Sequence, residues 1–143
     1  MSEFRVFHAL RKGAPPQEAQ SLKSEIRESL RRVIPDLSVV VTSAEEDFND
    51  NMARLGGWDA WEHDVATGIR YSDRQPRYHA IILTDEYFGK ATASITRQAI
   101  TANKLVMFFD PDTRDLDRVV GVQTLDESNW KTGWAPALAS VIP

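Results

Sequence analysis

The sequence of 143 residues contains no cysteine and only three histidines, His8, His63 and His79. A chain without thiols forms no disulfide, no thiolate metal site, no iron–sulfur cluster and no cysteine nucleophile. Three scattered histidines also argue against a histidine-rich metal centre. We therefore expect neither a metal nor a cofactor, and any catalysis has to rest on carboxylates.

Long apolar segments are missing too. No stretch approaches the roughly 20 consecutive apolar residues that span a bilayer. Residues 1–5 show neither the basic start nor the apolar core of a secretory signal. The net charge of −4 disfavours duplex nucleic acid as a partner, because such a surface needs an excess of positive charge. These absences predict a soluble, cytoplasmic protein that binds neither membranes nor duplex nucleic acid.

Glycine-rich phosphate-binding motifs are likewise absent. The chain has no GxGxxG and no GxxxxGK[ST], which argues against dinucleotide dehydrogenases and P-loop enzymes. It also lacks the GxSxG elbow of serine hydrolases.

Short apolar runs and helical periods alternate along the chain. The apolar runs predict strands at residues 4–10, 37–42, 78–83 and 105–109, with a fifth at 119–125. The helical periods predict helices at 17–34, 58–69 and 92–103, and a short closing helix within 133–142. Residues 43–57 are polar and acidic, and we expect an irregular loop there.

This alternation is typical of an α/β fold with a central parallel sheet. With no internal repeat and no linker, we expect residues 1–143 to form a single domain, a three-layer sandwich with four or five strands. In such sheets ligands bind outside the carboxyl ends of the strands. His8, Thr42 and Thr84 follow or end three strands and are candidate ligand contacts, although a packed histidine is an equal alternative for His8. Asp85 and Glu86 come next and form a candidate acid–base pair, with a solvated loop as the alternative.

Two charged segments have weaker functional signals. The acidic run of Glu45, Glu46, Asp47 and Asp50 offers oxygen ligands, but its spacing lacks the turn of a calcium loop, and a solvated loop is the favoured interpretation. The basic, aromatic stretch at residues 70–78 precedes the third predicted strand. It therefore lies opposite the expected crevice, where a surface or interface role is favoured.

Residues 61–110 resemble the TIR domain. Trp61 matches the family's helix tryptophan, Thr84 the serine at a strand end, and Tyr87 the nearby tyrosine, while Asn103-Lys104 matches a turn into the next strand. The resemblance implies a flavodoxin-like sheet and a nucleotide-derived ligand near Trp61, Tyr87 and the next helix. For Trp61, a place in the core is the favoured alternative.

The chain departs from the family at one decisive position. The catalytic glutamate of enzymatic TIR domains, which cleave the nicotinamide–ribose bond of NAD, corresponds to Thr96 here. Because threonine cannot serve as a carboxylate, the resemblance implies a ligand contact at Thr96 without that activity. The order of elements is also similar to the nucleoside 2-deoxyribosyltransferases, in which Asp85 would match an aspartate, but their helix-borne glutamate is again missing.

Three functions remain open on this basis. The first is a module that binds a nucleotide or nucleoside-type ligand, or a protein, without cleaving anything. The second is an N-glycosidic-bond enzyme, of the deoxyribosyltransferase or NAD glycohydrolase type, that uses Asp85, Glu86 or Glu62 instead. The third is an assembly subunit that self-associates, because acidic residues gather at 45–64 and basic ones at 70–77.

Overall fold

The computed structural model describes residues 3–11, 13–33, 35–84 and 90–119, and residues 117–119 are described by their backbone alone. Within these residues the strands are β1 (Glu3–His8), β2 (Ser38–Ser43), β3 (Ala80–Leu83), β4 (Leu105–Phe109) and β5 (Leu116–Val119). The helices are α1 (Pro16–Val33), α2 (Ala44–Leu55), α3 (Trp58–Thr67) and α4 (Lys90–Thr101). None of these helices is long and apolar enough to cross a membrane.

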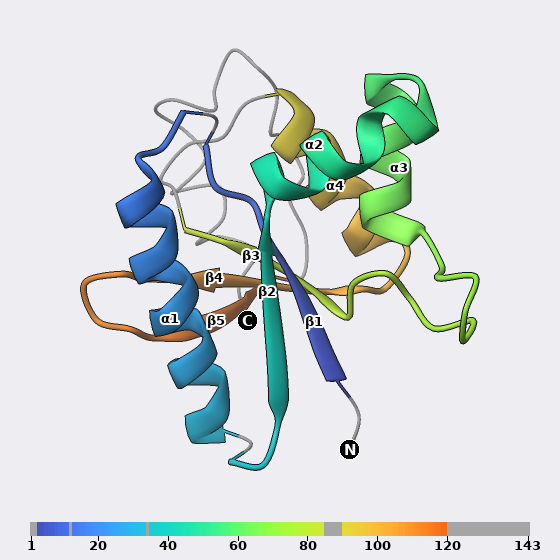
Figure 1. Ribbon diagram of the computed structural model, residues 1–143. Helices are drawn as coiled ribbons and strands as arrows, with labels where there is room; N and C mark the ends of the chain where they lie inside the picture. Colours follow the sequence, from blue (N-terminus) through green and yellow to red (C-terminus); the bar gives the residue numbers. More distant parts are fainter. Residues whose placement is uncertain (1–2, 12, 34, 85–89, 120–143) are drawn as a thin grey trace.

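The strands form one sheet in the order β2-β1-β3-β4-β5 (Figure 1). β1, β2, β3 and β4 run parallel, and β5 pairs antiparallel with β4. The predicted α/β fold with a central parallel sheet is therefore confirmed. The chain moves outward from β1 to β2 and then returns past β1 to β3, so its direction across the sheet reverses between β1 and β3.

Helices cover both faces of the sheet, which makes the three layers (Figure 1). Successive side chains of β1 point to opposite faces. Val6 packs with Ile26 and Leu30 of α1, whereas Phe7 packs with Trp61 and other apolar residues of α2, α3 and α4. Each face thus has its own apolar core, and the carboxyl ends of the strands emerge between the two helical layers.

The irregular loop predicted at residues 43–57 is wrong, because most of it is helix α2. Ser43 is the N-cap: its hydroxyl accepts a hydrogen bond from the Glu46 backbone while the Glu46 side chain accepts from the Ser43 backbone. Gly56 closes the helix with a φ of 80°, a left-handed conformation that glycine adopts without strain. β2 therefore passes into α2 with no loop between them.

The other boundaries differ from prediction by a few residues. The fifth strand begins at Leu116, earlier than predicted, and residues 120–125 of its predicted span lie outside the described residues. The closing helix predicted within 133–142 also lies outside them.

Candidate ligand site at the carboxyl edge of the sheet

The ends of β1 and β3 are joined by a buried hydrogen bond between two predicted site residues. His8 Nε2 lies 2.8 Å from Thr84 Oγ1, and the Ala9 backbone donates to the Ile82 carbonyl at 2.9 Å. His8 is fully buried and Thr84 is 6% exposed. The structure thus brings His8 and Thr84 together where the chain reverses direction across the sheet, which is the position that ligands favour in such folds.

Burial sets the charge of His8. It lowers the pKa of His8 to about 4, and the nearby positive charge of Lys23 acts in the same direction. The imidazole is therefore neutral near pH 7. Its Nδ1 atom is buried and has no hydrogen-bond partner within the described part of the chain. A buried nitrogen of this kind is uncommon, and it leaves His8 with one unused hydrogen-bonding atom beside the strand ends.

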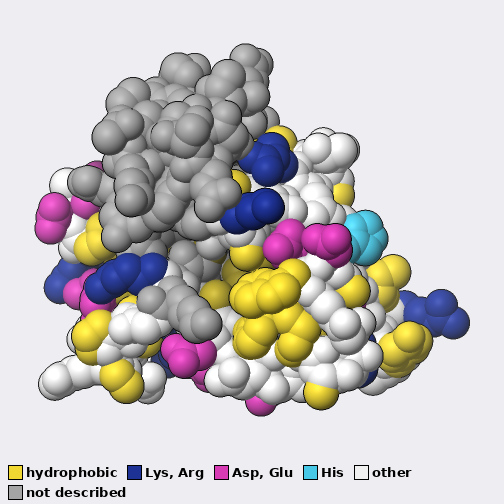
Figure 2. All heavy atoms as spheres, turned by 90° about the horizontal axis from the view of Figure 1, so that it is seen from above, with side chains coloured by type: hydrophobic (Ala, Val, Ile, Leu, Met, Phe, Trp, Pro, Cys, Tyr) yellow, Lys and Arg dark blue, Asp and Glu magenta, His cyan; other side chains and the backbone are white. Residues whose placement is uncertain are grey.

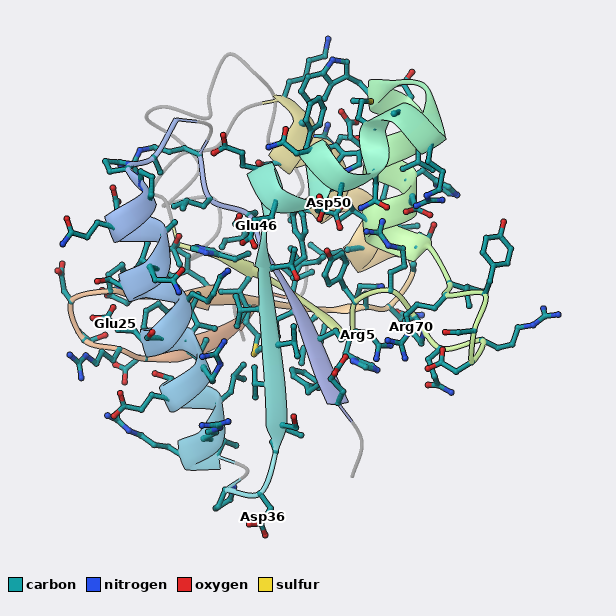
Figure 3. All side chains as sticks on the ribbon, viewed as in Figure 1. Arg5, Glu25, Asp36, Glu46, Asp50 and Arg70 are labelled. Carbon is teal, nitrogen blue, oxygen red and sulfur yellow. The ribbon has the colours of Figure 1, made fainter. Side chains whose placement is uncertain are left out.

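A groove of about 330 Å³ lies at the carboxyl ends of β1 and β2, between the first turns of α1 and α2. Neither His8 nor Thr84 is among the residues that line it. Its charged walls come from the two sides of β2: Arg11 and Lys23 on the α1 side, and Glu45 and Glu46 on the α2 side. Figure 3 shows Glu46 at the junction of β2 and α2. Seen from above the carboxyl edge, basic and acidic side chains are interspersed on the α1 side (Figure 2).

Ion pairs order both walls of the groove. Lys23 Nζ lies 2.7 Å from Glu46 Oε1, and Arg11 makes two hydrogen bonds to Glu18, of 2.7 and 3.0 Å. Burial works against ionisation of Glu46, but the hydrogen bonds from Lys23 and Ser43 outweigh it and lower the pKa of that carboxyl. The hydrogen bond from Arg11 lowers the pKa of Glu18. The groove therefore presents fixed charges of both signs at neutral pH.

The amino end of α1 contributes Pro16 to the lining of this groove. Pro16 is the first residue of α1, and proline suits that position because its missing N–H is not needed there. The first-turn N–H groups of Gln17 and Glu18 have no partner inside the helix, but neither residue lines the groove. The positive charge of the groove therefore comes from Arg11 and Lys23, which pair with Glu18 and Glu46.

A second polar cluster lies inside the protein, around Asp47. This carboxylate is 2% exposed; it accepts a hydrogen bond of 2.8 Å from Trp61 Nε1 and further ones from Arg77 and the Tyr78 hydroxyl. The Tyr78 hydroxyl also has a hydrogen bond with Thr42. The prediction of a solvated acidic loop is therefore wrong for Asp47, which is the centre of a buried network.

Two predicted ligand contacts, Trp61 and Thr42, belong to this buried network. Trp61, 3% exposed, packs in the core against Phe7 and Phe48, and Thr42 faces Tyr78. Both side chains are engaged with internal partners, and their roles in ligand binding stay predictions. Arg77 also turns inward, toward Asp47 and Asp64, whereas Tyr71, earlier in the same stretch, is 96% exposed. The surface or interface role of this stretch stays a prediction.

The remaining predicted residues divide into two groups. Thr96 is fully buried on α4, and its hydroxyl has no hydrogen-bond partner among the described residues. Glu62, on α3, is 9% exposed. Asp85, Glu86 and Tyr87 lie outside the described residues. Within the described residues no group of three or more acidic or histidine side chains is arranged to hold a metal ion.

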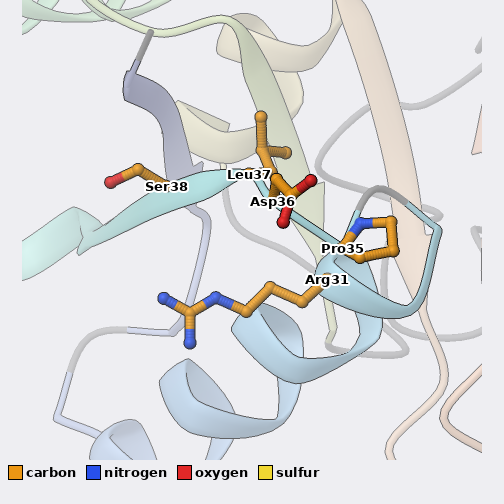
Figure 4. Close-up of a pocket in the computed structure, with 5 residues that line it drawn as sticks. All are labelled: Arg31, Pro35, Asp36, Leu37 and Ser38. Atoms are coloured by element: carbon orange, nitrogen blue, oxygen red, sulfur yellow. The ribbon is translucent and has the colours of Figure 1, made fainter. Parts of the chain in front are cut away.

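A further hollow lies at the other end of the strands, beside the amino end of β2. It measures about 280 Å³ and is lined by residues from the end of α1 and the start of β2, including Arg31, Asp36 and Ser38 (Figure 4). Because it adjoins the amino end of β2, it lies away from His8 and Thr84. It is wider open than the groove, and the carboxyl-edge groove is therefore the better candidate for a small-molecule site.

Arg11, Lys23 and Ser43 are polar residues of the groove that were not predicted as site residues from the sequence. Ser43 and Glu46 carry a signal that was available, since serine followed three residues later by glutamate is the capping-box pattern. Lys23 carries none, because a lysine on the polar side of an amphipathic helix is ordinary. Comparison of the chain with protein-family models, with curated proteins and with solved structures finds no match.

Proposed function

We propose that the chain is a binding module that holds a nucleotide-type ligand in the groove between α1 and α2 and does not cleave it. The observation that carries this proposal is the groove itself: about 330 Å³ at the carboxyl ends of β1 and β2, with cations on one wall and carboxylates on the other. That volume is at the lower end of the range of small-molecule pockets, about 300–1,000 Å³.

The two walls suit the two ends of a nucleotide. Arg11 and Lys23 attract a phosphate. Glu45 and Glu46 are carboxylates that accept hydrogen bonds from ribose hydroxyls. When the ligand binds, the Lys23–Glu46 ion pair is broken: Lys23 contacts the phosphate and Glu46 accepts from a ribose hydroxyl. Each of the two side chains therefore keeps a polar partner.

The absence of cleavage rests on Thr96. In both families that the chain resembles, a helix-borne glutamate attacks or stabilises the sugar, and the corresponding position here is Thr96, which is fully buried. Threonine has a hydroxyl group at that position and cannot serve as the carboxylate that cleavage requires. This supports binding over the N-glycosidase alternative.

Calorimetry with adenosine monophosphate, adenosine, NAD and inorganic phosphate tests the proposal. We expect adenosine monophosphate to bind more tightly than adenosine, and Lys23→Ala to weaken it by about tenfold, because a charge-assisted contact to phosphate contributes about 1.5 kcal/mol or more. Lys90→Ala, which removes an exposed lysine on α4, is the matched control and leaves binding unchanged.

Two results would overturn the proposal. One is the absence of binding heat with all four probes. The other is release of base, detected by chromatography, when the chain is incubated with NAD or deoxyadenosine. Base release that is lost in Asp85→Asn or Glu86→Gln would establish the enzymatic alternative in its place.

A further inference from the structure

Among the described residues, the outer edge of β2 is an unpaired strand edge. β2 stands at the end of the strand order, and in the described part of the chain no segment pairs with its outer side. Its sequence, SVVVTS, contains neither proline nor a charged residue, which are two common means by which proteins keep an edge strand from pairing. Val40, in its middle, is 39% exposed. Figure 1 shows β2 in front of β1, with α1 to one side.

A contact from Arg27 indicates which backbone groups of β2 point outward. Arg27 Nε donates to the Val39 carbonyl at 3.3 Å, so this carbonyl is directed away from β1. The N–H and C=O of one strand residue point to the same side, and the side alternates along the strand. The N–H and C=O groups of Val39 and Val41 therefore face the open edge, where an added strand would find them.

A row of three cations follows this edge. Lys23, Arg27 and Arg31 are spaced four residues apart on α1, so they lie on one face of the helix. Lys23 lines the groove at the carboxyl end of β2, Arg27 contacts Val39, and Arg31 lines the hollow at the amino end. In Figure 4 the Arg31 side chain extends from α1 alongside β2. The seam between α1 and β2 thus carries a row of cations and is hollowed at both ends. Carboxylates also lie at the two ends, Glu46 beside Lys23 in the groove and Asp36 beside Arg31 in the hollow.

The spacing of these cations fits a strand. Four residues of helix rise about 6 Å, and two residues of strand advance about 6.7 Å. Side chains at alternate positions of a strand laid beside β2 would therefore meet successive members of the basic row.

We propose that this seam is a docking site for an extended, acidic segment of a partner protein, which adds a strand to the outer edge of β2. Its backbone pairs with the outward groups of Val39 and Val41, and acidic side chains at every second position face Lys23, Arg27 and Arg31. This is the strand-addition mode of peptide recognition, in which backbone hydrogen bonds provide affinity and alternate side chains provide specificity.

A second copy of this chain fits the seam less well. Antiparallel pairing of two β2 strands keeps both α1 helices on the same face of the joined sheet. The two basic rows would then approach each other, and like charges across an interface are unfavourable. The charge of the seam therefore favours an acidic partner over self-association.

Fluorescence anisotropy with a labelled nine-residue peptide, in which glutamate and valine alternate, tests this docking site. We expect saturable binding that weakens as salt is added, and that falls by about tenfold or more in the double variant R27E/R31E, because two attractive pairs become repulsive. Arg32→Glu is the matched control on the same helix: Arg32 pairs with Glu28 instead, and its reversal changes binding little. Circular dichroism confirms that each variant is folded.

The backbone contribution is tested with the peptide rather than the protein. Two forms of the same peptide keep its charge and are N-methylated along one backbone edge or along the other. Because an added strand pairs with β2 through one edge only, the proposal expects one form to lose binding and the other to keep it. Binding that survives in both forms overturns strand addition, and so does equal binding of the R27E/R31E and R32E variants. Failure of the alternating peptide to bind, together with light scattering that shows a dimer, would assign the edge to self-association instead. Lys23 belongs to both the groove and the basic row, but the R27E/R31E variant keeps Lys23 and changes only residues outside the groove. These results therefore do not depend on nucleotide binding.

Discussion

The Arg77 guanidinium and the Asp47 carboxylate form an ion pair beneath α2 and α3, with the Asp47 side chain almost completely buried. Trp61 and Tyr78 donate to the same carboxylate. A buried ion is tolerated only where several partners replace its water, and here the partners come from α3 and from the segment before β3. The pair therefore fixes how α2 and α3 sit against the sheet.

Loss of the Asp47 charge should destabilise the fold. We expect Asp47→Asn to lower the free energy of unfolding by about 3 kcal/mol, because it leaves Arg77 without one of its two carboxylate partners in a partly buried position. Urea denaturation measures the change. Asp50→Asn, an exposed aspartate on the same helix, is the control, with an expected change within about 0.5 kcal/mol. Equal effects of the two substitutions would refute the buried network.

The Tyr78 hydroxyl should resist ionisation in alkaline solution. Burial raises the pKa of Tyr78, and the negative charge of Asp47 raises it further. Phenolate absorbance of the folded chain at pH 11 should consequently be the same for the natural sequence and for Tyr78→Phe. A smaller absorbance in Tyr78→Phe, while circular dichroism still reports the folded state, would contradict the hydrogen bond to Asp47.

Stability should depend on pH through His8. The pKa of His8 in the folded chain is about 4, below its ordinary value near 6.5, so between these pH values the unfolded chain binds a proton that the folded chain does not. The free energy of unfolding should fall by ~3 kcal/mol as the pH drops from about 6.5 to about 4. Burial also lowers the pKa of His79, which acts in the same direction.

Two variants separate the histidines in urea denaturation at pH 7 and pH 5. His8→Gln should remove most of the difference in stability between the two pH values, whereas His79→Gln should retain most of it. The reverse pattern would show that the buried pair of His8 and Thr84 is not the pH-sensitive element.

The Ser43 cap should contribute measurably to stability. Ser43→Ala removes the hydroxyl that accepts from the Glu46 backbone, and we expect a loss of about 1 kcal/mol, the usual cost of losing an N-cap. Ser38→Ala, at the exposed start of the same strand, is the control. Thermal unfolding of both variants measures the difference, and an effect of Ser43→Ala no larger than that of Ser38→Ala would argue against the capping box.

The fold was largely predictable because its strands are continuous apolar runs separated by helices with clear stripes. Val39, Val40 and Val41 read as a strand without ambiguity, and the order of elements required a parallel sheet. α2 was missed although its core-facing residues repeat at helical spacings of four, four and three: Ala44, Phe48, Met52 and Leu55. The acidic and asparagine residues between them made the segment look like a solvated loop. The capping box at Ser43 was a second available signal.

The sequence predicted a site at the carboxyl ends of the strands, but the residues that line the groove were not among the predicted ligand contacts. The rule for parallel sheets located His8 and Thr84 at one edge, and the structure joins them. The buried position of Asp47 and the partly buried position of Arg77 could not be predicted in this way, since a charged residue in a polar segment is usually solvated. Only the tertiary fold brings Arg77 across to α2, because the two residues lie far apart in the chain.

Neighbouring residues Glu46 and Asp47 lie in the first turn of α2 but face different surroundings, Glu46 toward the groove and Asp47 toward the interior. Because β2 enters α2 without a loop, this turn has little freedom to move independently of the sheet. The proposed ligand, by taking Lys23 from Glu46, would act on the turn whose Asp47 accepts a hydrogen bond from the Trp61 indole. We therefore expect occupancy of the groove to change the fluorescence of Trp61, which would make this side chain an optical reporter of binding.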